Sequence, residues 1–371
     1  MKVIISINTT WNIFNFRVGL IKTLQSQGYQ VFALSPMDEY VKRLEEIGVQ
    51  HIPIKLDQQG INPFKDLNLI RKYYTIFKSI RPDLILSYTI KPNIYGNLAA
   101  KRLKIPTINN ISGLGTLFIN SNIITSYIGK LLYKIGLSSS KHVFFQNQDD
   151  KDLFIQSRLT SDKNSSLIPG SGVNIKHFKS NRITNKGKRF LFSGRLIGDK
   201  GIFEYLEAAI IVLKKFPDVE FLLAGELGVN NKTAISVDNL NGHLEKNSQL
   251  KYIGKSDNML ELLKTIDVMV LPSYREGLSK SLLEANAMKI PIITSDVPGC
   301  RDIVTHGYNG FLCKVKSVDS LARSIEKIIE ISNEMRHEMG LNGRIHIEQF
   351  FSEEKVINHY LNQVNRLLKN S

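Results

Sequence analysis

The sequence has little cysteine, no long apolar run and a deficit of acidic side chains. Its two cysteines, Cys300 and Cys313, cannot form a disulfide framework, and neither has neighbours at metal-ligand spacing. We therefore expect a reducing compartment. No stretch approaches the ~20 apolar residues that span a bilayer. The opening residues MKVIISINTTWNIF carry too short an apolar run for a signal peptide, so they predict a first β-strand and a cytoplasmic protein.

The shortage of acidic residues leaves a strongly basic chain. Its 371 residues include 49 Lys and Arg against 34 Asp and Glu, a formal net charge of +15. Such a chain is expected to attract an anionic partner, which can be nucleic acid, acidic lipid or a phosphorylated substrate. A basic solvated surface without a specific partner is the alternative.

Short β-rich apolar runs alternate with helical patterns, which predicts an α/β protein whose parallel sheets are covered by helices on both faces. The first half has expected strands at 3–7, 31–35, 84–89 and 142–146 and expected helices at 16–28, 39–48, 65–80, 92–104 and 121–138. The second half repeats the order with strands at 190–194, 219–225 and 268–273 and helices at 201–215 and 257–266. Two doubly wound halves result, and we expect them to bind a ligand in a cleft outside the carboxyl ends of their strands.

The alternation pauses at the polar, basic stretch 177–190, so we place the domain boundary there. The predicted domains are residues 1–180 and 181–351. In the tail, 352–371, Ser352 is a natural N-cap and acidic residues follow it, which predicts a terminal helix.

The stretch FLFSGRLIGDKGIFEYLEAA (190–209) predicts a strand, a glycine loop and a helix. Gly194 and Gly201 let the backbone approach a ligand, and the helix N-terminus offers unpaired N–H groups. Arg195 and Lys200 flank the loop, so two cations and a helix end predict a seat for a diphosphate. The loop matches neither the Walker A nor the G-x-G-x-x-G pattern. A basic, solvent-facing turn is the alternative.

Two glutamates stand eight positions apart in a second loop and helix. The loop Glu276-Gly277-Leu278 leads into a helix whose expected N-cap is Ser279, and Glu284 lies in the second turn. A carboxylate would repel a phosphate, but it accepts hydrogen bonds from hydroxyls. The pair therefore predicts a nucleotide-sugar, with Glu276 on the hydroxyls of one sugar and Glu284 on the vicinal hydroxyls of the other. Two solvated glutamates are the alternative.

These motifs resemble the retaining glycosyltransferases of family 4, which have the GT-B fold. The resemblance covers nearly the whole chain and rests on the E-x7-E spacing of Glu276 and Glu284 together with SGRLIGDKG upstream. Further similar segments are IPGSGVNIKHF (168–178), DVPGCRDIVTHGYNGFLC (296–313), SYTIKPNIYGNLAAK (87–101) and ISGLGTLF (111–118). The N-terminal half is most similar to the bacterial subgroup that extends undecaprenyl-diphosphate-linked sugars in O-antigen, capsule or glycoprotein glycan assembly.

The resemblance implies a UDP-sugar bound mainly to the C-terminal domain and retention of the anomeric configuration, and it places the terminal helix against the N-terminal domain. No metal or other cofactor is expected, because cations and helix ends can stabilise the leaving diphosphate. The catalytic residues implied are Glu276, Arg195 and Lys200. The donor-binding residues implied are Gly194, Arg195, Lys200, Gly254, Gly277, Leu278, Ser279 and Glu284, with Glu284 on the ribose and the loop at Gly254 near the base.

The acceptor side departs from the family pattern. Many members place a His near the transferred sugar, whereas the matching loops here offer Lys91, Asn93, Asn110 and Ser112 as acceptor-side candidates. The usual Gly-Gly of the first loop is also absent. The segment TTWNIFNFR (9–17) replaces it and contributes Asn12 and Asn15 as candidates.

The segment 120–142 has an apolar stripe with Lys130 and Lys134 beside it. Its members are Ile123, Ile124, Tyr127, Leu131, Leu132 and Ile135. Such a stripe can rest on an anionic leaflet, and packing against the sheet is the alternative. The basic excess and a lipid-linked acceptor favour a peripheral location at the inner face of the plasma membrane.

Other functions fit parts of the sequence. A nucleic-acid-binding protein would explain the charge, but the aromatic residues follow core patterns rather than a basic platform, so no nucleic acid is expected as a partner. A GT-B UDP-sugar epimerase would share fold and donor, and a noncatalytic sensor would leave Glu276 without a role. A glycoside hydrolase would need a second carboxylate facing Glu276. The acidic run DDKD (149–152) suits the start of a helix better than a Mg²⁺ site.

Overall fold

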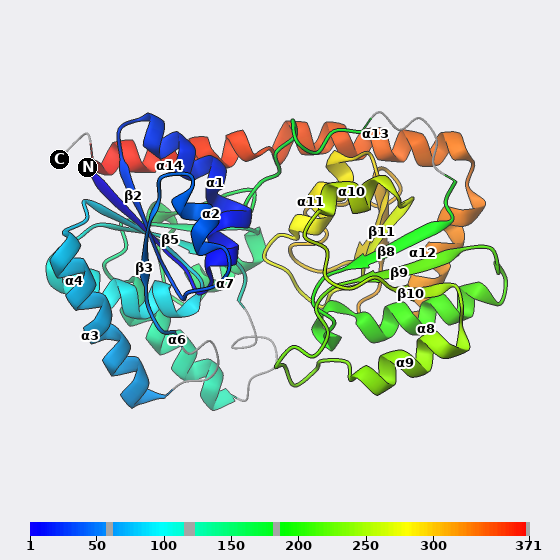
Figure 1. Ribbon diagram of the computed structural model, residues 1–371, viewed down its shortest axis with the longest axis horizontal. Coiled ribbons are helices and arrows are strands. Elements are labelled where there is room, and N and C mark those ends of the chain that lie inside the picture. Colours follow the sequence, from blue (N-terminus) through cyan, green and yellow to red (C-terminus); the bar gives the residue numbers. More distant parts are fainter. Residues whose placement is uncertain (57–61, 115–122, 181–185, 369–371) are drawn as a thin grey trace. The chain divides into compact units, whose positions relative to one another are not determined.

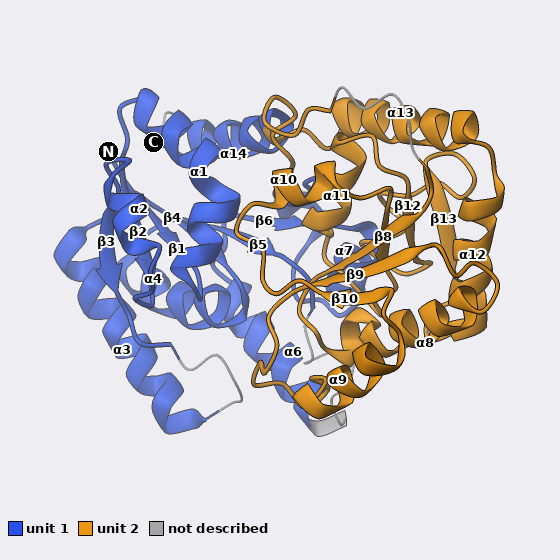
Figure 2. Cartoon of the chain, turned by 45° about the vertical axis from the view of Figure 1, so that its right-hand side comes forward, with its two compact units in different colours: residues 1–171, 354–371 blue, residues 172–353 orange. Residues whose placement is uncertain are grey.

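The computed structural model describes residues 1–56, 62–114, 123–180 and 186–368, without the side chains of residues 123 and 124. The chain divides into two compact units (Figures 1 and 2), each with its own sheet. Unit 1 comprises residues 1–171 and 354–371, and unit 2 comprises residues 172–353. Every strand pair among the described residues is parallel, which confirms the α/β prediction.

Unit 1 contains a seven-stranded sheet in the order β3-β2-β1-β4-β5-β6-β7. Its strands are β1 (Lys2–Ser6), β2 (Gln30–Ser35), β3 (Gln50–Pro53), β4 (Leu84–Tyr88), β5 (Thr107–Ile111), β6 (His142–Phe145) and β7 (Ser165–Leu167). Its helices are α1 (Thr10–Ser26), α2 (Val41–Glu45), α3 (Pro63–Ile80), the π-helical turn η1 (Pro92–Gly96), α4 (Asn97–Leu103), α6 (Ile123–Leu137), α7 (Gln148–Gln156) and the 3₁₀ turn η2 (Asp162–Asn164).

Unit 2 contains a six-stranded sheet in the order β10-β9-β8-β11-β12-β13. Its strands are β8 (Arg189–Ser193), β9 (Glu220–Ala224), β10 (Leu250–Tyr252), β11 (Val268–Leu271), β12 (Ile292–Ser295) and β13 (Gly310–Cys313). Its helical elements are the 3₁₀ turn η3 (Gly198–Lys200), α8 (Ile202–Leu213), α9 (Val237–Lys246), α10 (Met259–Lys264), α11 (Lys280–Ala287), α12 (Val318–Glu330) and α13 (Asn333–Phe350).

Both sheets are doubly wound and reverse direction at their middle. The chain moves outward from β1 through β2 to β3, then returns to the other side of β1 to form β4. Unit 2 does the same, moving from β8 through β9 to β10 and returning to β11 beside β8. Adjacent loops diverge where the order reverses, and this opens a crevice at the carboxyl ends of the two central strands. Ligands are therefore expected after β1 and β4 in unit 1 and after β8 and β11 in unit 2.

The first helix begins earlier than the sequence predicted. We expected a helix from residue 16 and a loop over residues 9–17, but α1 starts at Thr10. The side-chain oxygen of Thr9 accepts a hydrogen bond from the backbone N–H of Asn12 (3.2 Å), which caps the first turn. Asn12 and Asn15 are therefore helical residues, and the loop prediction for this segment was wrong.

The passage between the units belongs to unit 2 from residue 172 onward, whereas the predicted boundary was residue 180. Val173 and Phe178 are buried in the core of unit 2. The guanidinium of Arg344 in α13 donates hydrogen bonds to the carbonyl oxygens of Ile175 (2.9 Å) and Phe178 (2.6 Å). These contacts fix residues that looked like a polar linker in the sequence.

The last helix, α14 (Glu353–Leu368), contributes to the core of unit 1. Val356, Tyr360 and Val364 recur at helical spacing and are buried in the cluster that contains Val3 and Ile5 of β1. Among the described helices, none combines the length and the apolar character needed to cross a bilayer.

Candidate active site

The crevice of unit 2 is formed by the loop after β8 and the loop after β11, which are in direct contact. The loop after β8 ends at Gly201, whose φ is +77°, and a Cβ there would lie 2.2 Å from the carbonyl oxygen of Pro272 after β11. The backbone N–H of Tyr274 donates to the carbonyl of Asp199 (2.9 Å), and the Ser273 hydroxyl donates to the same oxygen (3.2 Å). Only glycine permits this approach, so Gly201 fixes the distance between the two predicted motifs.

A second glycine positions Glu276. Gly299, in the turn after β12, has a φ of +78°, and a Cβ there would lie 2.4 Å from the carbonyl oxygen of Glu276. The N–H of Glu276 donates to the carbonyl of Pro298 (3.1 Å), and the N–H of Ser279 donates to that of Gly299 (3.4 Å). The backbone carrying Glu276 and Gly277 is therefore held by the segment PGC.

Two helices of unit 2 begin without a side-chain cap. Helices α9, α10, α12 and α13 are each capped by a Ser or Asn side chain. In contrast, the N-cap of α8 is Gly201, which has no side chain, and the hydroxyl of Ser279, the N-cap of α11, does not cap its helix. These are the two helices that follow the central strands. The N-cap residue therefore gives the first N–H groups of these helices no side-chain acceptor, and such a helix end can bind an anionic ligand.

The two predicted cations, Arg195 and Lys200, lie before the N-terminus of α8, but they differ in exposure. The Arg195 side chain is exposed after β8. Lys200 is mostly buried, and its ammonium forms an ion pair with the carboxylate of Glu276. Arg195 and Lys200 both lie in the loop that leads to α8, so their charge adds to the positive end of that helix dipole. Lys200 and Glu276, which are 76 positions apart in sequence, are thus brought into direct contact.

Glu284 is a buried acid in the second turn of α11. Its side chain is 8% exposed, and burial raises its pKa to about 7, while Lys280 one turn earlier opposes that shift. The Lys280 ammonium lies 3.9 Å from the carboxylate, beyond hydrogen-bonding distance. A buried carboxyl group with so weak a partner is costly unless a ligand supplies hydrogen-bond donors.

Three glycines lie side by side where β8, β9 and β10 end. Gly194 donates from its N–H to the carbonyl of Ala224 (3.0 Å), and Gly225 donates to that of Gly254 (3.0 Å). A Cβ on Gly225 would lie 1.9 Å from the carbonyl oxygen of Gly194. The Tyr252 hydroxyl donates to the carbonyl of Gly225 (2.9 Å). The three strand ends therefore meet through glycine backbone at the end predicted to meet the base.

Two family models match the chain, one over each unit. "Glycosyl transferase 4-like" matches residues 2–147, and "Glycosyl transferases group 1" matches residues 173–346. Together the two models cover most of the chain and show that it is a glycosyltransferase. The predicted family, fold and enzyme class are confirmed.

Proteins similar to this glycosyltransferase cover from about three quarters of its length to nearly all of it. It is 28% identical, over 97% of both chains, to N,N'-diacetylbacillosaminyl-diphospho-undecaprenol alpha-1,3-N-acetylgalactosaminyltransferase of Campylobacter jejuni. It is 23% identical, over 73% of both chains, to UDP-Gal:alpha-D-GlcNAc-diphosphoundecaprenol alpha-1,3-galactosyltransferase of Escherichia coli. The crystal structure of Anabaena Alr3699/HepE in complex with UDP and glucose shares the fold, with a TM-score of 0.80 at 17% identity, covering 98% of this chain and 99% of that one.

Most acceptor-side candidates of unit 1 already form hydrogen bonds or an ion pair within the unit. The Lys91 ammonium lies 2.9 Å from the carboxylate of Asp66. The Asn93 amide donates to the carbonyl of Asn110 (2.9 Å), and the Ser112 hydroxyl donates to the side chain of Asn110 (3.0 Å). Asn12 lies apart from them in the first turn of α1. The structure thus links the buried Asn93 and Asn110 and the exposed Ser112 in one network at the end of β5, without assigning them to a ligand.

The acidic run at 149–152 is accounted for by helix formation. Asp149 and Asp150 lie in the first turn of α7, and the Asp150 N–H donates to the side-chain oxygen of the N-cap, Asn147 (2.8 Å). Among the described residues, no three His, Cys, Asp or Glu side chains are grouped so that they could hold a metal ion.

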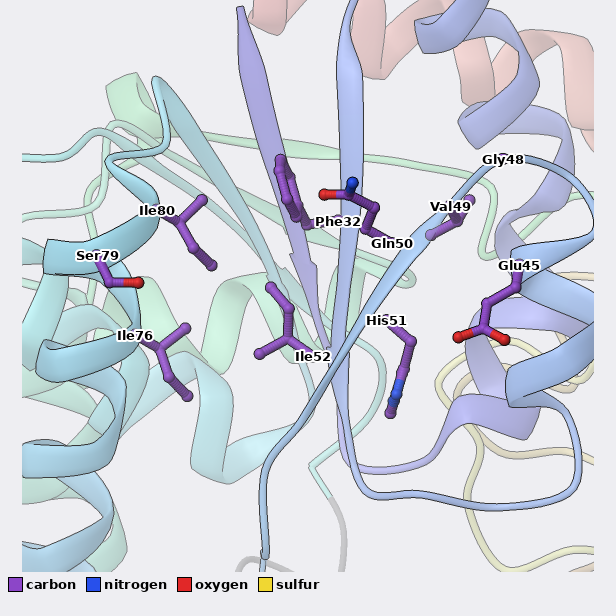
Figure 3. A pocket seen from close by; sticks show the side chains of 10 residues that line it. All are labelled: Phe32, Glu45, Gly48, Val49, Gln50, His51, Ile52, Ile76, Ser79 and Ile80. Carbon is purple, nitrogen blue, oxygen red and sulfur yellow. The ribbon is translucent and has the colours of Figure 1, made fainter.

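A cavity of about 660 Å³ surrounds the edge strand β3 in unit 1 (Figure 3). Ile76 and Ile80 of α3 line it on one side of the strand, and Glu45 lines it on the other. None of the predicted site residues lies among the residues that line it. The cavity is therefore separate from the crevices at the strand ends.

Proposed function

We propose that the enzyme is a retaining glycosyltransferase that moves a sugar from a UDP-sugar to an undecaprenyl-diphosphate-linked saccharide in bacterial O-antigen or capsule assembly. The sugar is an N-acetylhexosamine such as GalNAc, or a hexose. The observation that carries the proposal is the crevice of unit 2, where two uncapped helix ends and two cations adjoin two carboxylates. The activities for which the relatives from C. jejuni and E. coli are named support the acceptor class, and the E. coli relative also supports a UDP donor.

In this proposal the donor lies along the crevice with its diphosphate at the ends of α8 and α11. Negative charge builds on the β-phosphate as the sugar leaves, and Arg195, Lys200 and the helix N–H groups stabilise it without a metal. Glu276 accepts hydrogen bonds from the transferred sugar, and Glu284 accepts them from the ribose. The ion pair with Glu276 holds the Lys200 ammonium beside the sugar-binding carboxylate before the donor arrives.

Retention follows if the departing phosphate oxygen takes the proton of the acceptor hydroxyl on the face from which it leaves. The acceptor oxygen then forms its bond to the anomeric carbon on that same face. NMR of the product tests this step through the anomeric coupling constant. A product with inverted configuration would contradict it.

The donor and acceptor are identified by a screen of radiolabelled UDP-sugars against synthetic GalNAc- and GlcNAc-diphospholipids. We expect transfer to a diphospholipid with one UDP-sugar strongly preferred. Each UDP-sugar is also incubated without acceptor. Conversion to an epimer in that control, with no transfer in the complete reaction, would replace the proposed activity by that of an epimerase.

The exposed face of α6 supports the proposed membrane location. Tyr127 is 70% exposed, and Leu131 and Ile135 continue its stripe on the surface, so the stripe does not pack against the sheet. Tyr133 and Leu137 face the core instead. Ile123 and Ile124, also predicted members, have side chains outside the described residues, and Leu132 is half-buried.

The N-terminal end of helix α3 exposes a second group of apolar side chains at the same edge of unit 1. Phe64 is 88% exposed and Leu67 is also exposed in the first turns of α3. Figures 1 and 2 both show the N-terminal ends of α3 and α6 reaching the lower edge of this unit. Lys65 and Lys134 are exposed on the two helices. Apolar side chains among lysines suit the surface of an anionic bilayer, at ~1 kcal/mol per basic residue close to the lipid.

Flotation of the full chain with liposomes tests this location. We expect binding to vesicles that contain anionic lipid, weaker binding at high salt, and a loss of binding in the double variant Tyr127→Ser, Leu131→Ser. Met335→Ser, which removes an exposed apolar side chain from unit 2, serves as the matched control and should float like the wild type. Absence of the wild type from anionic vesicles at low salt would reject the membrane proposal without affecting the transferase proposal.

A further inference from the structure

A buried cation in unit 1 has no anionic partner. Arg17 lies in the second turn of α1, and its side chain is 4% exposed. Its Nε is buried and donates no hydrogen bond, and no carboxylate pairs with its guanidinium among the residues that the structure describes. The guanidinium lies over the ring of Tyr88, whose centroid is 4.3 Å from Cζ.

The buried guanidinium of Arg17 lacks the partners that a charged group inside a protein normally has. Arginine keeps its charge in a protein interior, and it carries five N–H donors that need acceptors. A buried charge is normally paired, because desolvation without a partner is strongly unfavourable. The face of an aromatic ring attracts the guanidinium but accepts no conventional hydrogen bond in its plane. The Nε of Arg17 therefore has no acceptor among the residues that the structure describes.

The position of Arg17 is the one at which a doubly wound sheet binds ligands. Helical side chains tilt toward the N-terminus of their helix, so the guanidinium reaches back toward the carboxyl end of β1. Tyr88, on which it stacks, is the last residue of β4. Strands β1 and β4 flank the point where the strand order of unit 1 reverses. Arg17 thus lies in the helix that follows the first central strand of unit 1, whereas Arg195 and Lys200 lie in the loop that follows the first central strand of unit 2.

Apart from Arg17, the polar groups near Tyr88 are neutral. Its ring lies 6.0 Å from that of Tyr360, whose hydroxyl accepts a hydrogen bond from the Asn110 amide (2.9 Å). Ser112 extends this network through the side-chain oxygen of Asn110. Burial raises the pKa of Tyr360, Arg17 opposes the shift, and no carboxylate contributes to it. The cluster therefore combines one uncompensated positive charge with hydroxyl and amide groups.

We propose that Arg17 binds a phosphate group of the acceptor's diphosphate at the strand-reversal crevice of unit 1. A planar guanidinium matches two oxygens of a phosphate at once, which a lysine does not. The ligand chemistry is a phosphate oxyanion, and its source is the sugar-linked diphospholipid rather than free phosphate. The inference rests on the proposed function, because that function supplies the diphosphate. It makes Arg17 the residue that distinguishes a lipid-diphosphate acceptor from a neutral glycoside.

The test uses the full chain and two soluble acceptors with the same sugar. One is an N-acetylhexosamine linked through a diphosphate to a short prenyl chain, and the other is the same sugar on a neutral alkyl chain. The variants are Arg17→Met, which removes charge and donors, and Arg17→Lys, which keeps the charge but loses the fork. Lys22→Gln removes one charge from the exposed face of the same helix and is the matched control.

We expect Arg17→Met to raise the KM for the diphosphate acceptor by about 10- to 100-fold, the loss usual for a charge-assisted hydrogen-bonded contact. Its KM for the UDP-sugar and its rate on the neutral acceptor should stay at wild-type values. Arg17→Lys should be intermediate, and Lys22→Gln should match the wild type. If Arg17→Met keeps the wild-type preference for the diphosphate acceptor, Arg17 does not bind the diphosphate.

Stability distinguishes a binding residue from a structural one. Removing an unpaired buried charge should leave the melting temperature of Arg17→Met equal to or above that of the wild type. With UDP saturating, millimolar pyrophosphate and the diphosphate acceptor are then added separately. The acceptor should raise the melting temperature of the wild type and of Lys22→Gln but not of Arg17→Met, and pyrophosphate should act more weakly because it lacks the sugar.

A sharp fall in the stability of Arg17→Met would make Arg17 structural and overturn the inference. Stabilisation of the wild type by pyrophosphate as strong as that by the acceptor would assign the site to free phosphate, and would overturn it as well. The proposed function fails separately, if the wild type binds no UDP and transfers sugar to neither acceptor.

Discussion

Replacing Glu284 by Gln should stabilise the unliganded protein and weaken UDP binding. Burial raises the pKa of Glu284 from 4.5 to about 7, against a partial opposing effect of Lys280. Below pH 4.5 the carboxyl group is neutral in both the folded and unfolded chains. Between pH 4.5 and 7 the unfolded chain ionises first, so the folded state loses stability as pH rises through this window. Glutamine remains neutral throughout and escapes the loss.

The size of the effect follows from the two pKa values. Integrating the difference in bound protons gives a wild-type deficit of about 1 kcal/mol at pH 5 and about 3 kcal/mol at pH 8. The advantage of Glu284→Gln should therefore grow by about 2 kcal/mol between these pH values. For a unit of this size that is roughly 4–8 °C in melting temperature. An amide of almost the same volume adds no packing change that could mimic the pH dependence.

Thermal denaturation of the wild type and Glu284→Gln at pH 5 and pH 8 measures this difference. Glu245→Gln, which changes an exposed acid on α9, is the control and should show no such dependence.

Isothermal titration with UDP completes the test. Affinity for the wild type should fall about tenfold from pH 8 to pH 6, because only the ionised carboxylate accepts both ribose hydroxyls. In Glu284→Gln that step should vanish and binding should be about 10-fold weaker at pH 8. An equal stability difference at both pH values, or unchanged UDP affinity, would refute the reasoning.

Three further substitutions test the rest of the unit 2 crevice. Lys200→Met should lower kcat by about 10²- to 10³-fold, since it removes a cation from the leaving diphosphate, and wild-type kcat would contradict this. Glu276→Gln should lower kcat at least about 10²-fold while calorimetry shows UDP affinity preserved; a loss of UDP binding instead would move Glu276 to the nucleotide. Gly299→Ala should cost about 1–3 kcal/mol of stability and displace Glu276, measured by denaturation and rate, because its Cβ meets a carbonyl at 2.4 Å. Gly228→Ala has a similar positive φ in open space and should cost less, so equal costs would remove the steric explanation.

The parts of the site that the sequence could predict are those encoded within one strand, loop and helix. Arg195 and Lys200 lie in the loop between β8 and α8, and Glu276 and Glu284 flank the start of α11. The alternation of apolar runs also predicted the doubly wound sheets, because each strand–helix pair is recognisable by its own period.

Contacts between distant segments could not be predicted. The pairing of Lys200 with Glu276 depends on the approach of Gly201 to Pro272, which no local pattern encodes. The network that occupies Asn110 depends on Tyr360, 250 positions away. A lone arginine in an amphipathic helix usually lies on the solvated face, so Arg17 gave no signal until the fold placed it inside.

The features that weaken the unliganded chain occur where the two sheets reverse their strand order. Helices α8 and α11 lack side-chain caps. Glu284 is buried, and the ammonium of Lys280 lies beyond hydrogen-bonding distance from its carboxylate. Arg17 has no anionic partner among the described residues. Each of these breaks a rule that the capped helices and apolar cores of the same units obey. Each would be satisfied by a group of a substrate: the donor's phosphate oxygens for the helix ends, the donor's hydroxyls for Glu284, and the acceptor's phosphate oxygens for Arg17. A stable core surrounding a few unsatisfied polar groups is the arrangement expected of a binding site, because the free energy withheld from folding is recovered when the ligand binds.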